Sequence, residues 1–498
     1  MTAQRESFLA ADNTTQAGRQ RYDRIVKPLT RRTVLGGAGA IFGGAERVSA
    51  SGRGEPKVLL RNGGWCWYQD ERAIVAGNKL IFGSVAGSTR DGLDRGDIVA
   101  GWVDLDSGET GAAKLAAKFQ SDDHDAPAFL ELPGGRVLAS FMTHGGGATQ
   151  ADTRAMHWRI STRPGDPAEW GPVRKADTGG TISYANLFRL SSENGKIYNF
   201  HRRRSDDSPG NNPNYMVSTD GGESFRYGGR LLYWPTPEKS DPKYTGIDGA
   251  RPYLKYASNN EDTIHFVATE DHPRAYDNSI YHGYIFGGRV YRSDGAEVGP
   301  LGEGGKTGIR PTDLTRVFEG AADRVAWTMD LHLDARGNPY TVFSVQTDGA
   351  AERSERGATS VGQDHRYWYA RWDGSRWAAH EIAFAGTRLY PGEDDYTGLG
   401  ALHPHDPDTV FISTNAEPES GRPLVSKADG KRHREVFRGV TSDGGRTWAW
   451  TPVTRDSAFD NIRPLVPIWK PGRTALLWLR GEFRTYTDFS LDVVGLID

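Results

Sequence analysis

The sequence has one cysteine, little net charge and no long apolar run, and each shortage excludes a class of protein. The single cysteine, Cys66, has no partner for a disulfide within the chain. A formal net charge of −3 over 498 residues gives no reason to expect a nucleic-acid partner. No apolar run reaches the roughly 18 residues that a membrane-spanning helix needs, so we expect no membrane partner.

Glycine and aromatic residues are abundant, with 62 Gly, 14 Trp and 20 Tyr. Alanine-rich stretches that would form helices are few, so this mixture indicates many short strands joined by tight turns. The length alone would suggest about three domains at roughly 150 residues each, but large all-β folds can form one unit.

The first 50 residues have the pattern of a targeting segment. Arg31 and Arg32 precede a short glycine-rich apolar stretch, which closes with the small residues Val48-Ser49-Ala50. This order is typical of a twin-arginine export signal, which carries folded proteins; the alternative is a disordered basic tail. We therefore predict a signal over residues 1–50, a mature domain over 51–498 and a secreted protein. A chain without disulfides suits folding in the cytoplasm before export.

A strand–turn–strand pattern recurs seven times along the chain. In residues 121–146, "AFLEL" and "RVLASFM" flank a Pro-Gly-Gly turn centred on Gly134. The other six turns lie near Gly77, Glu193, Asn260, Arg336, Asp406 and Pro471. Repeated β units without helical spacers are typical of a β-propeller, whose blades are four-stranded sheets. The sequence thus predicts an all-β, seven-bladed β-propeller, because the alternative of two packed β-sandwiches would not explain seven similar hairpins.

Two further repeats agree with this architecture. "STDGGESF" at 218–225 and "TSDGGRTW" at 441–448 share the pattern Ser/Thr-x-Asp-Gly-Gly-x-Ser/Thr-aromatic. This is the Asp box of sialidase-like propellers, in which the carboxylate holds a tight glycine turn. Such boxes lie in outer turns away from active sites, so they indicate the fold and not the chemistry.

The open end of the Gly134 hairpin carries two histidines. His124 lies ten residues before Gly134 and His144 lies ten residues after it. Equidistant residues of an antiparallel hairpin face each other, so we expect the two imidazoles to be neighbours. Asp122 and Asp123 precede His124, and one of these carboxylates is expected to orient its ring.

The next two hairpins bring a phenol and two cations to a matching depth. Tyr184 and Arg202 lie nine residues before and after the turn near Glu193, and Arg251 lies nine residues before the turn near Asn260. Each has a purely structural alternative, since a strand tyrosine can simply pack and the arginines at 202–204 can be solvated. If the open ends line one face of the channel, these residues share one pocket with the histidines.

β-Elimination on a uronic acid needs this set of groups. A guanidinium neutralises the carboxylate beside C5 and stabilises the enolate-like intermediate. An imidazole or a phenol takes the C5 proton, and a phenol can protonate the departing O4. Whether histidine or tyrosine is the base stays open. The predicted catalytic residues are His124, His144, Tyr184 and Arg202, with Arg251 in substrate binding.

Five stretches, "NGGWCWYQDERAIV", "DDHDAPAFL", "NSIYHGYIFGG", "DNIRPLVP" and "LLWLRGEF", resemble the BNR-4 repeat family, which includes ulvan lyases and rhamnosyl-glucuronate lyases on seven-bladed propellers. The resemblance covers about residues 57–498 and implies a polysaccharide lyase that cleaves rhamnosyl-uronate linkages, as in ulvan or gum arabic side chains. It implies catalytic roles for His124, His144, Tyr184 and Arg202, and a binding role for Arg251. Two features depart from the family pattern: Asp125 stands where Asn is expected, and the arginine run leaves open which member faces the site.

The sequence also bears on cofactors, on the binding partner and on alternative functions. Five other histidines, His265, His272, His282, His332 and His365, show no metal-ligand spacing, so no cofactor is expected, and a structural calcium or zinc ion is left open by the resemblance. The expected partner is a uronic-acid polysaccharide, bound by a monomer. The alternatives are a propeller glycoside hydrolase (α-L-rhamnosidase or sialidase-like) and a non-catalytic carbohydrate-binding propeller. A sialidase-type triad of Arg251, Arg463 and Arg480 would lack a glutamate near Tyr184.

Overall fold

The computed structural model describes residues 55–145, 152–206, 208–247, 249–302, 308–348 and 361–498. The predicted export signal at 1–50 lies outside these residues and stays a prediction. Among the described residues, no helix is long and apolar enough to cross a membrane.

The described chain forms seven antiparallel sheets in succession. Blade 1 contains β2 (Ala73–Ala76), β3 (Lys79–Val85), β4 (Ile98–Asp104) and β5 (Thr110–Ala116). Blade 2 contains β6 (Ala128–Glu131), β7 (Val137–Phe141), β8 (Ala155–Arg163) and β10 (Arg174–Asp177), with β9 (Asp166–Trp170) also paired to β8. Blade 3 contains β11 (Thr181–Leu190), β12 (Lys196–Ser205), β13 (Ser208–Ser218) and β14 (Arg226–Arg230).

Blade 4 is the largest, with β15 (Leu254–Ser258), β16 (Thr263–Ala268), β17 (Ile280–Phe286), β18 (Arg289–Arg292), β19 (Glu297–Pro300) and β20 (Thr315–Phe318). Blade 5 contains β21 (Val325–Leu333), β22 (Pro339–Gln346), β23 (His365–Trp372) and β24 (Trp377–Gly386). Blade 6 contains β25 (Gly400–His403), β26 (Asp406–Thr414), β27 (Glu435–Val440) and β28 (Ala449–Pro452). Blade 7 contains β29 (Asp460–Leu465), β30 (Ala475–Thr485), β31 (Asp488–Ile497) and, from the other end of the chain, β1 (Lys57–Leu60).

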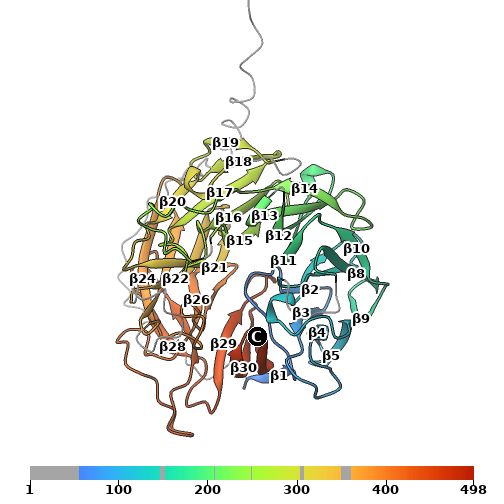
Figure 1. The fold of residues 1–498 in the computed structure, drawn as a ribbon. Coiled ribbons are helices and arrows are strands. Elements are labelled where there is room, and N and C mark those ends of the chain that lie inside the picture. Colours follow the sequence, from blue (N-terminus) through green and yellow to red (C-terminus); the bar gives the residue numbers. More distant parts are fainter. Residues whose placement is uncertain (1–54, 146–151, 207, 248, 303–307, 349–360) are drawn as a thin grey trace, which may run out of the picture. The chain divides into compact units, whose positions relative to one another are not determined.

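The all-β, seven-bladed propeller predicted from the sequence is confirmed. Each predicted hairpin forms the first two strands of one blade, and in most neighbouring blades the first strands pack against one another. Figure 1 shows the blades following one another around a ring, with β1 beside the C-terminal strands. Three short 3-10 helices, η1 (Asp123–Asp125), η2 (Ser191–Glu193) and η3 (Pro311–Asp313), interrupt the strands.

Both Asp boxes lie in the turn between the third and fourth strands of a blade. In blade 3, Asp220 accepts from the backbone N–H of Ser224 at 3.0 Å. In blade 6, Asp443 accepts from the backbone N–H of Thr447 at 3.0 Å. These turns are at the same end of the blade as the hairpin turns, because successive strands are antiparallel. The Asp boxes therefore lie at the opposite end of the blades from the open hairpin ends.

The connection between β1 and β2 runs through the middle of the ring. Its hydrogen bonds reach Arg463 in blade 7, Thr328 in blade 5, Lys255 in blade 4 and Ala185 in blade 3. Its aromatic side chains are almost fully buried, with Trp65 0% and Tyr68 2% exposed. The centre of the propeller is thus a packed aromatic core, on which the open ends of the hairpins rest.

Candidate active site

His124 and His144 lie face to face, as their distances from Gly134 predict. Their ring centroids are 3.8 Å apart and the planes differ by 9°. The register of the hairpin explains this, because β6 pairs with β7 through Leu130 and Leu138, symmetrically about Gly134. His144 is the more accessible ring, with 22% of its side chain exposed against 3% for His124.

One carboxylate binds both imidazoles. Asp122 Oδ1 lies 2.6 Å from Nδ1 of His124, and Asp122 Oδ2 lies 3.0 Å from Nδ1 of His144. Asp122 also caps η1 by accepting from the backbone N–H of His124 at 3.0 Å. Because both Nδ1 atoms are tied to the same group, both Nε2 atoms remain for other partners.

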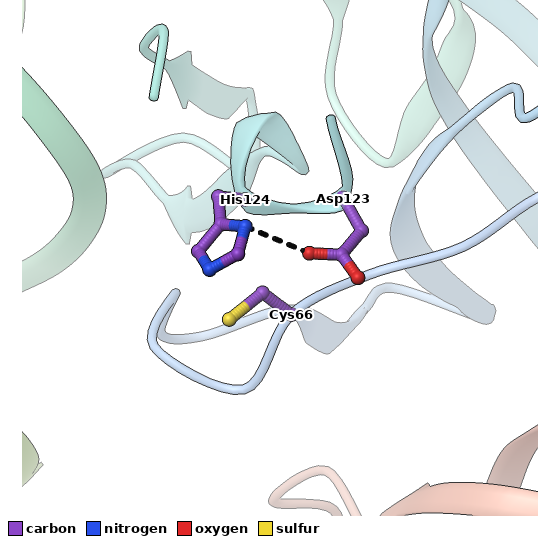
Figure 2. A group of neighbouring side chains, drawn as sticks. All are labelled: Cys66, Asp123 and His124. Atoms are coloured by element: carbon purple, nitrogen blue, oxygen red, sulfur yellow. Dashed lines mark ion pairs between the residues drawn. The ribbon is translucent and has the colours of Figure 1, made fainter. Parts of the chain in front are cut away.

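A second carboxylate supports the buried ring from below. Asp123 Oδ1 lies 2.9 Å from His124 Nδ1, and Asp123 Oδ2 accepts from Arg463 at 2.6 Å. Figure 2 shows His124 between Asp123, on its Nδ1 side, and the sulfur of Cys66, which lies beneath the ring. Arg463 comes from β29 in blade 7, so this contact joins blade 7 to the connection that leads into blade 2.

The two imidazoles have different protonation states. Burial by itself lowers the pKa of His124, but its interactions with Cys66, Tyr184 and Asp122, among others, outweigh burial and raise it well above 6.5. Burial and the charge of His124 lower the pKa of His144 to about 4, against the opposing effect of Asp122. Burial would raise the pKa of Asp122, but the two imidazoles outweigh it and hold it below its usual range. At neutral pH His124 is therefore an imidazolium and His144 a neutral imidazole.

Tyr184 lies beside both rings because its strand bulges. The β11–β12 register shifts between Ser183 and Asn186, and Tyr184 itself has a left-handed backbone with φ +71°. Its ring centroid is 5.6 Å from that of His124 and 6.1 Å from that of His144. The bulge makes Ser183, not Tyr184, the direct partner of Arg202, a one-residue difference from the predicted spacing. Burial raises the pKa of Tyr184 well above 10 despite the nearby Arg202, so the phenol is neutral.

Arg202 packs over the ring of Tyr184, and two of its side-chain nitrogens make no hydrogen bond to the described residues. Its guanidinium carbon lies 4.5 Å from the ring centroid of Tyr184 and 4.8 Å from that of Tyr253. The residue is 6% exposed, yet Nε and Nη1 have no hydrogen-bond partner among the described residues. A buried guanidinium with open donors is suited to receive a carboxylate.

Within the arginine run, the structure distinguishes Arg202 from Arg203. Arg203 points to the other side of the strand, where Nε donates to the carbonyl of Thr178 at 2.6 Å and the guanidinium covers Tyr227. This follows from the alternation of side chains along β12. The run thus presents Arg202 to the histidines and keeps Arg203 away from them.

Arg251 is the least closely placed of the predicted site residues. It precedes β15, and its positive charge acts on Asp271, whose pKa burial raises to about 6 while Arg251 lowers it. Two residues on, Tyr253 does contact Arg202. The structure therefore brings His124, His144, Tyr184 and Arg202 together, whereas the charge of Arg251 acts on Asp271.

Asp125, the departure from the family pattern, is completely buried. Neither of its carboxyl oxygens has a hydrogen-bond partner among the described residues. Burial, together with the charges of Asp122 and Asp123, raises its pKa well above the usual value. A protonated Asp125 is uncharged, as the expected asparagine would be.

Several residues of the site had no counterpart in the sequence patterns. Tyr396 Oη lies 3.5 Å from His124 Nε2, and Tyr253 packs against Arg202. Tyr396 comes from the connection between β24 and β25, outside every predicted hairpin. Matched distances from turn centres identify only residues in hairpins, so this signal could not have found it.

Three groups of side chains carry metal-ligand chemistry. They are Cys66, Asp123 and His124; Asp122, His124 and His144; and His272, Glu393 and Asp395. In the first two groups the carboxylates already bind imidazoles or Arg463. In the third, Arg274 binds Glu393 at 2.6 Å, which places a cation where a metal ion would have to approach.

Known proteins share this fold. Residues 66–385 match the model of the family described as BNR repeat-containing family member. No curated protein matches the chain in sequence. A structure of a new family of polysaccharide lyase, PL25 ulvan lyase, bound to -[GlcA(1-4)Rha3S]-, is 15% identical over 88% of this chain and 94% of that chain, with a TM-score of 0.61. A second structure of PL25 ulvan lyase gives 15% identity, 88% and 95% coverage and a TM-score of 0.61. The polysaccharide lyase Uly1 is 11% identical over 91% and 94%, with a TM-score of 0.49. The TM-scores of the two PL25 ulvan lyase structures show that this chain shares their fold.

Proposed function

The chain belongs to the BNR repeat-containing family, and from that premise we propose that it is a secreted polysaccharide lyase that cleaves rhamnosyl-uronate linkages by β-elimination. One observation carries the proposal: Arg202 keeps two open donors next to a neutral phenol and a histidine pair. The fold shared with PL25 ulvan lyase supports it.

In the proposed reaction the uronate carboxylate binds the open side of Arg202. Neutralising this carboxylate makes the C5 proton acidic enough to remove, and the charge that develops on the carboxylate in the transition state strengthens the contact. The C5–H electrons form the C4–C5 double bond, the C4–O4 bond breaks, and O4 leaves with a proton. The products are a 4,5-unsaturated uronate and a shortened chain.

The four residues divide the proton transfers between them. His144 is the neutral and more exposed imidazole, so it takes the C5 proton on Nε2. Tyr184 is a neutral phenol and donates to O4. His124 stays protonated beneath them and adds positive charge where the enolate forms, while Asp122 orients both imidazoles.

The glycosidase alternative is less well supported by this geometry. Glycoside hydrolysis ordinarily uses two carboxyl groups that face the substrate from either side of the bond. Here Asp122 and Asp123 lie behind the histidines and are engaged by them and by Arg463. Arg463 is consequently unavailable for a sialidase-type triad.

An absorbance assay tests the proposed function. A lyase releases a 4,5-unsaturated uronate, which absorbs in the ultraviolet, whereas a hydrolase releases rhamnose or sialic acid without this absorbance. We expect an increase on ulvan-type or gum-arabic-type polymers that is absent from the His144→Ala variant. Release of reducing sugar without absorbance would favour the hydrolase, and binding without either product would favour a non-catalytic propeller.

A further inference from the structure

A buried lysine at the centre of the ring has no part in the proposed proton transfers. Lys255, in β15 of blade 4, is 0% exposed, although lysine is seldom fully buried unless a partner holds its charge. Its Nζ donates to the carbonyl of Trp67 at 2.6 Å and lies 2.5 Å from Oδ2 of Asp70. Among the described residues, the other cation that pairs with Asp70 is Arg72, whose Nε lies 3.8 Å from Oδ1. Lys255 is therefore the main partner of a buried carboxylate.

Asp70 in turn holds the strand that carries Tyr184. Its backbone N–H donates to the carbonyl of Ala185 at 3.1 Å, and its carbonyl accepts from the N–H of Leu187 at 2.7 Å. These two bonds form a parallel bridge between Asp70 and Asn186. Because β11 is the edge strand of blade 3, the bonds fix its free edge directly after Tyr184.

The same connection between β1 and β2 also holds the histidine. The backbone N–H of Cys66 donates to the carbonyl of Asp123 at 2.9 Å, and the side-chain amide of Gln69 donates to the carbonyl of His124. Both acceptors belong to η1. One connection thus fixes the backbone of His124 and the backbone next to Tyr184 relative to each other.

Tyr184 needs such support because its backbone is strained. A tyrosine with φ +71° adopts a conformation that persists only where the surrounding structure holds it. Proton transfer requires the phenol to come within hydrogen-bonding distance of the leaving oxygen. A small displacement of the phenol therefore slows the reaction, while the carboxylate contact to Arg202 can still bind the substrate.

We propose that Lys255 and Asp70 are positioning residues, whose ion pair holds the backbone of Asp70 against β11 and so keeps the Tyr184 phenol in place for proton transfer. The proposal rests on the proposed lyase function, and both residues act through Tyr184. An ion pair that only stabilised the fold would change the fraction of folded enzyme and leave the rate of each folded molecule unchanged. The two roles can therefore be separated by experiment.

The test is a double-mutant cycle between Lys255 and Tyr184. Initial ultraviolet absorbance rates are measured on ulvan-type and gum-arabic-type polymers, after the folded fraction of each variant has been determined by circular dichroism. Lys255→Met keeps an unbranched side chain and removes the cation. We expect kcat to fall by about tenfold to 100-fold, with KM within about threefold of the wild type. In the Tyr184→Phe background the same substitution should change kcat by less than about twofold, because no phenol is left to position.

The outcomes of the cycle distinguish this proposal from the proposed function. An unchanged kcat in Lys255→Met, or an equal loss with and without the phenol, overturns the positioning role and leaves the lyase proposal standing. Absence of unsaturated product from the wild type on both polymers overturns the lyase proposal, and this proposal with it.

Two further variants guard against a purely structural effect. Should Lys255→Met fail to fold, the double variant Asp70→Asn, Lys255→Met takes its place, because it leaves no buried carboxylate without its cation. It still lacks the anchor on Trp67, so the same dependence on the phenol is expected, and wild-type kcat in this variant overturns the proposal.

The matched control breaks an ion pair at the other end of the blades. Arg371 Nη2 lies 3.1 Å from Asp334, a carboxylate 5% exposed in the hairpin turn of blade 5. Arg371→Met should leave kcat within about twofold in both backgrounds. An equal loss of kcat in this control would assign the effect to lost stability and overturn the positioning role.

Discussion

Two of the pairs of neighbouring histidines in the described part of the propeller differ in whether a carboxylate joins them. His124 and His144 stack and share Asp122. In blade 4, His265 Nδ1 lies 3.1 Å from His282 Nε2, and His282 Nδ1 lies 2.7 Å from the hydroxyl of Ser293, so the partners described for this pair are neutral.

The difference determines what each pair can do. Burial lowers the pKa of His265 to about 3, and burial and His265 hold that of His282 well below its usual value. Both rings are therefore neutral and hold β16 and β17 together. In the first pair, Cys66, Tyr184 and Asp122 raise the pKa of His124 against the effect of burial, while burial and His124 lower that of His144, so one imidazole is charged and the other neutral. Burial leaves both histidines of the blade 4 pair neutral, whereas the neighbours of the first pair separate its two pKa values.

Each pair also lies beside a tyrosine, and the two phenols provide the strongest test of the contrast. The ring of Tyr184 is 5.6 Å from His124 and that of Tyr284 is 5.2 Å from His265. Tyr184→Phe should lower kcat by about 10²- to 10⁴-fold, because it removes the proposed proton donor while keeping the packing. Tyr284→Phe should leave kcat within about twofold, since this phenol has no part in the proposed proton transfers. Initial ultraviolet absorbance rates of the two variants test this prediction. A fully active Tyr184→Phe variant would remove the phenol from the mechanism.

The cation beside the first pair is the next test. Arg202→Ala should cost roughly 2–4 kcal/mol of transition-state stabilisation, or about 30- to 1000-fold in kcat/KM. Arg203→Ala is the matched control, because its guanidinium binds the carbonyl of Thr178 on the other side of β12. Both enzymes are compared by kcat/KM on the same polymer. Equal losses at the two positions would show that the arginine run does not have the register described.

Asp122→Asn removes the carboxylate shared by His124 and His144, so that this pair, like His265 and His282, has no carboxylate joining its rings. We expect a loss of about 10- to 100-fold in kcat, because the imidazoles lose their common anchor. Asp122 is one of the groups that raise the pKa of His124, so its removal lowers that pKa. If catalysis needs protonated His124, the alkaline limb of the kcat/KM profile moves to lower pH. A profile that keeps its shape while its height falls would assign Asp122 a purely structural role.

Changing the second pair, His265 and His282, should alter the stability of the protein rather than its activity. His265 has a folded pKa of about 3, below the roughly 6.5 of an unfolded histidine, so the unfolded chain binds more protons as the pH falls. Stability is then complete above about pH 6.5 and decreases as the pH drops towards 3. His265→Gln should flatten this decrease between pH 7 and 4.5 by about 1–2 kcal/mol, measured by denaturant unfolding at each pH. An unchanged slope would show that His265 is not the titrating group.

The sequence predicts most of the fold but only part of the candidate site. Turn residues and alternating strands locate all seven hairpins, because both signals are local. His124 and His144 follow from hairpin symmetry, since the register about Gly134 is regular. The one-residue shift at Tyr184 does not follow, because a bulge depends on packing around the strand and not on the spacing of its residues.

Contacts between elements are the part of the site that the sequence does not predict. Asp122 or Asp123 was expected to orient His124, but the bond from Asp122 to His144 depends on how η1 meets the end of β7. Arg463 reaches Asp123 from another blade, and Tyr396 approaches His124 from a connection with no repeated pattern. The contacts of Arg463 and Tyr396 join residues that are 340 and 272 positions apart, and no local spacing encodes them.

The pairing of β1 with β31 sets an order of events during synthesis. Lys57 lies opposite Gly495, so β1 has no partner until β31 has been made. Ring closure therefore waits for β31, and the contact that it needs joins the first described strand to the last. The β1 edge stays open to other strands throughout translation. Deleting Lys57–Leu60 would leave blade 7 with three strands, and the edge of β31 would then stay open to other strands in the folded protein.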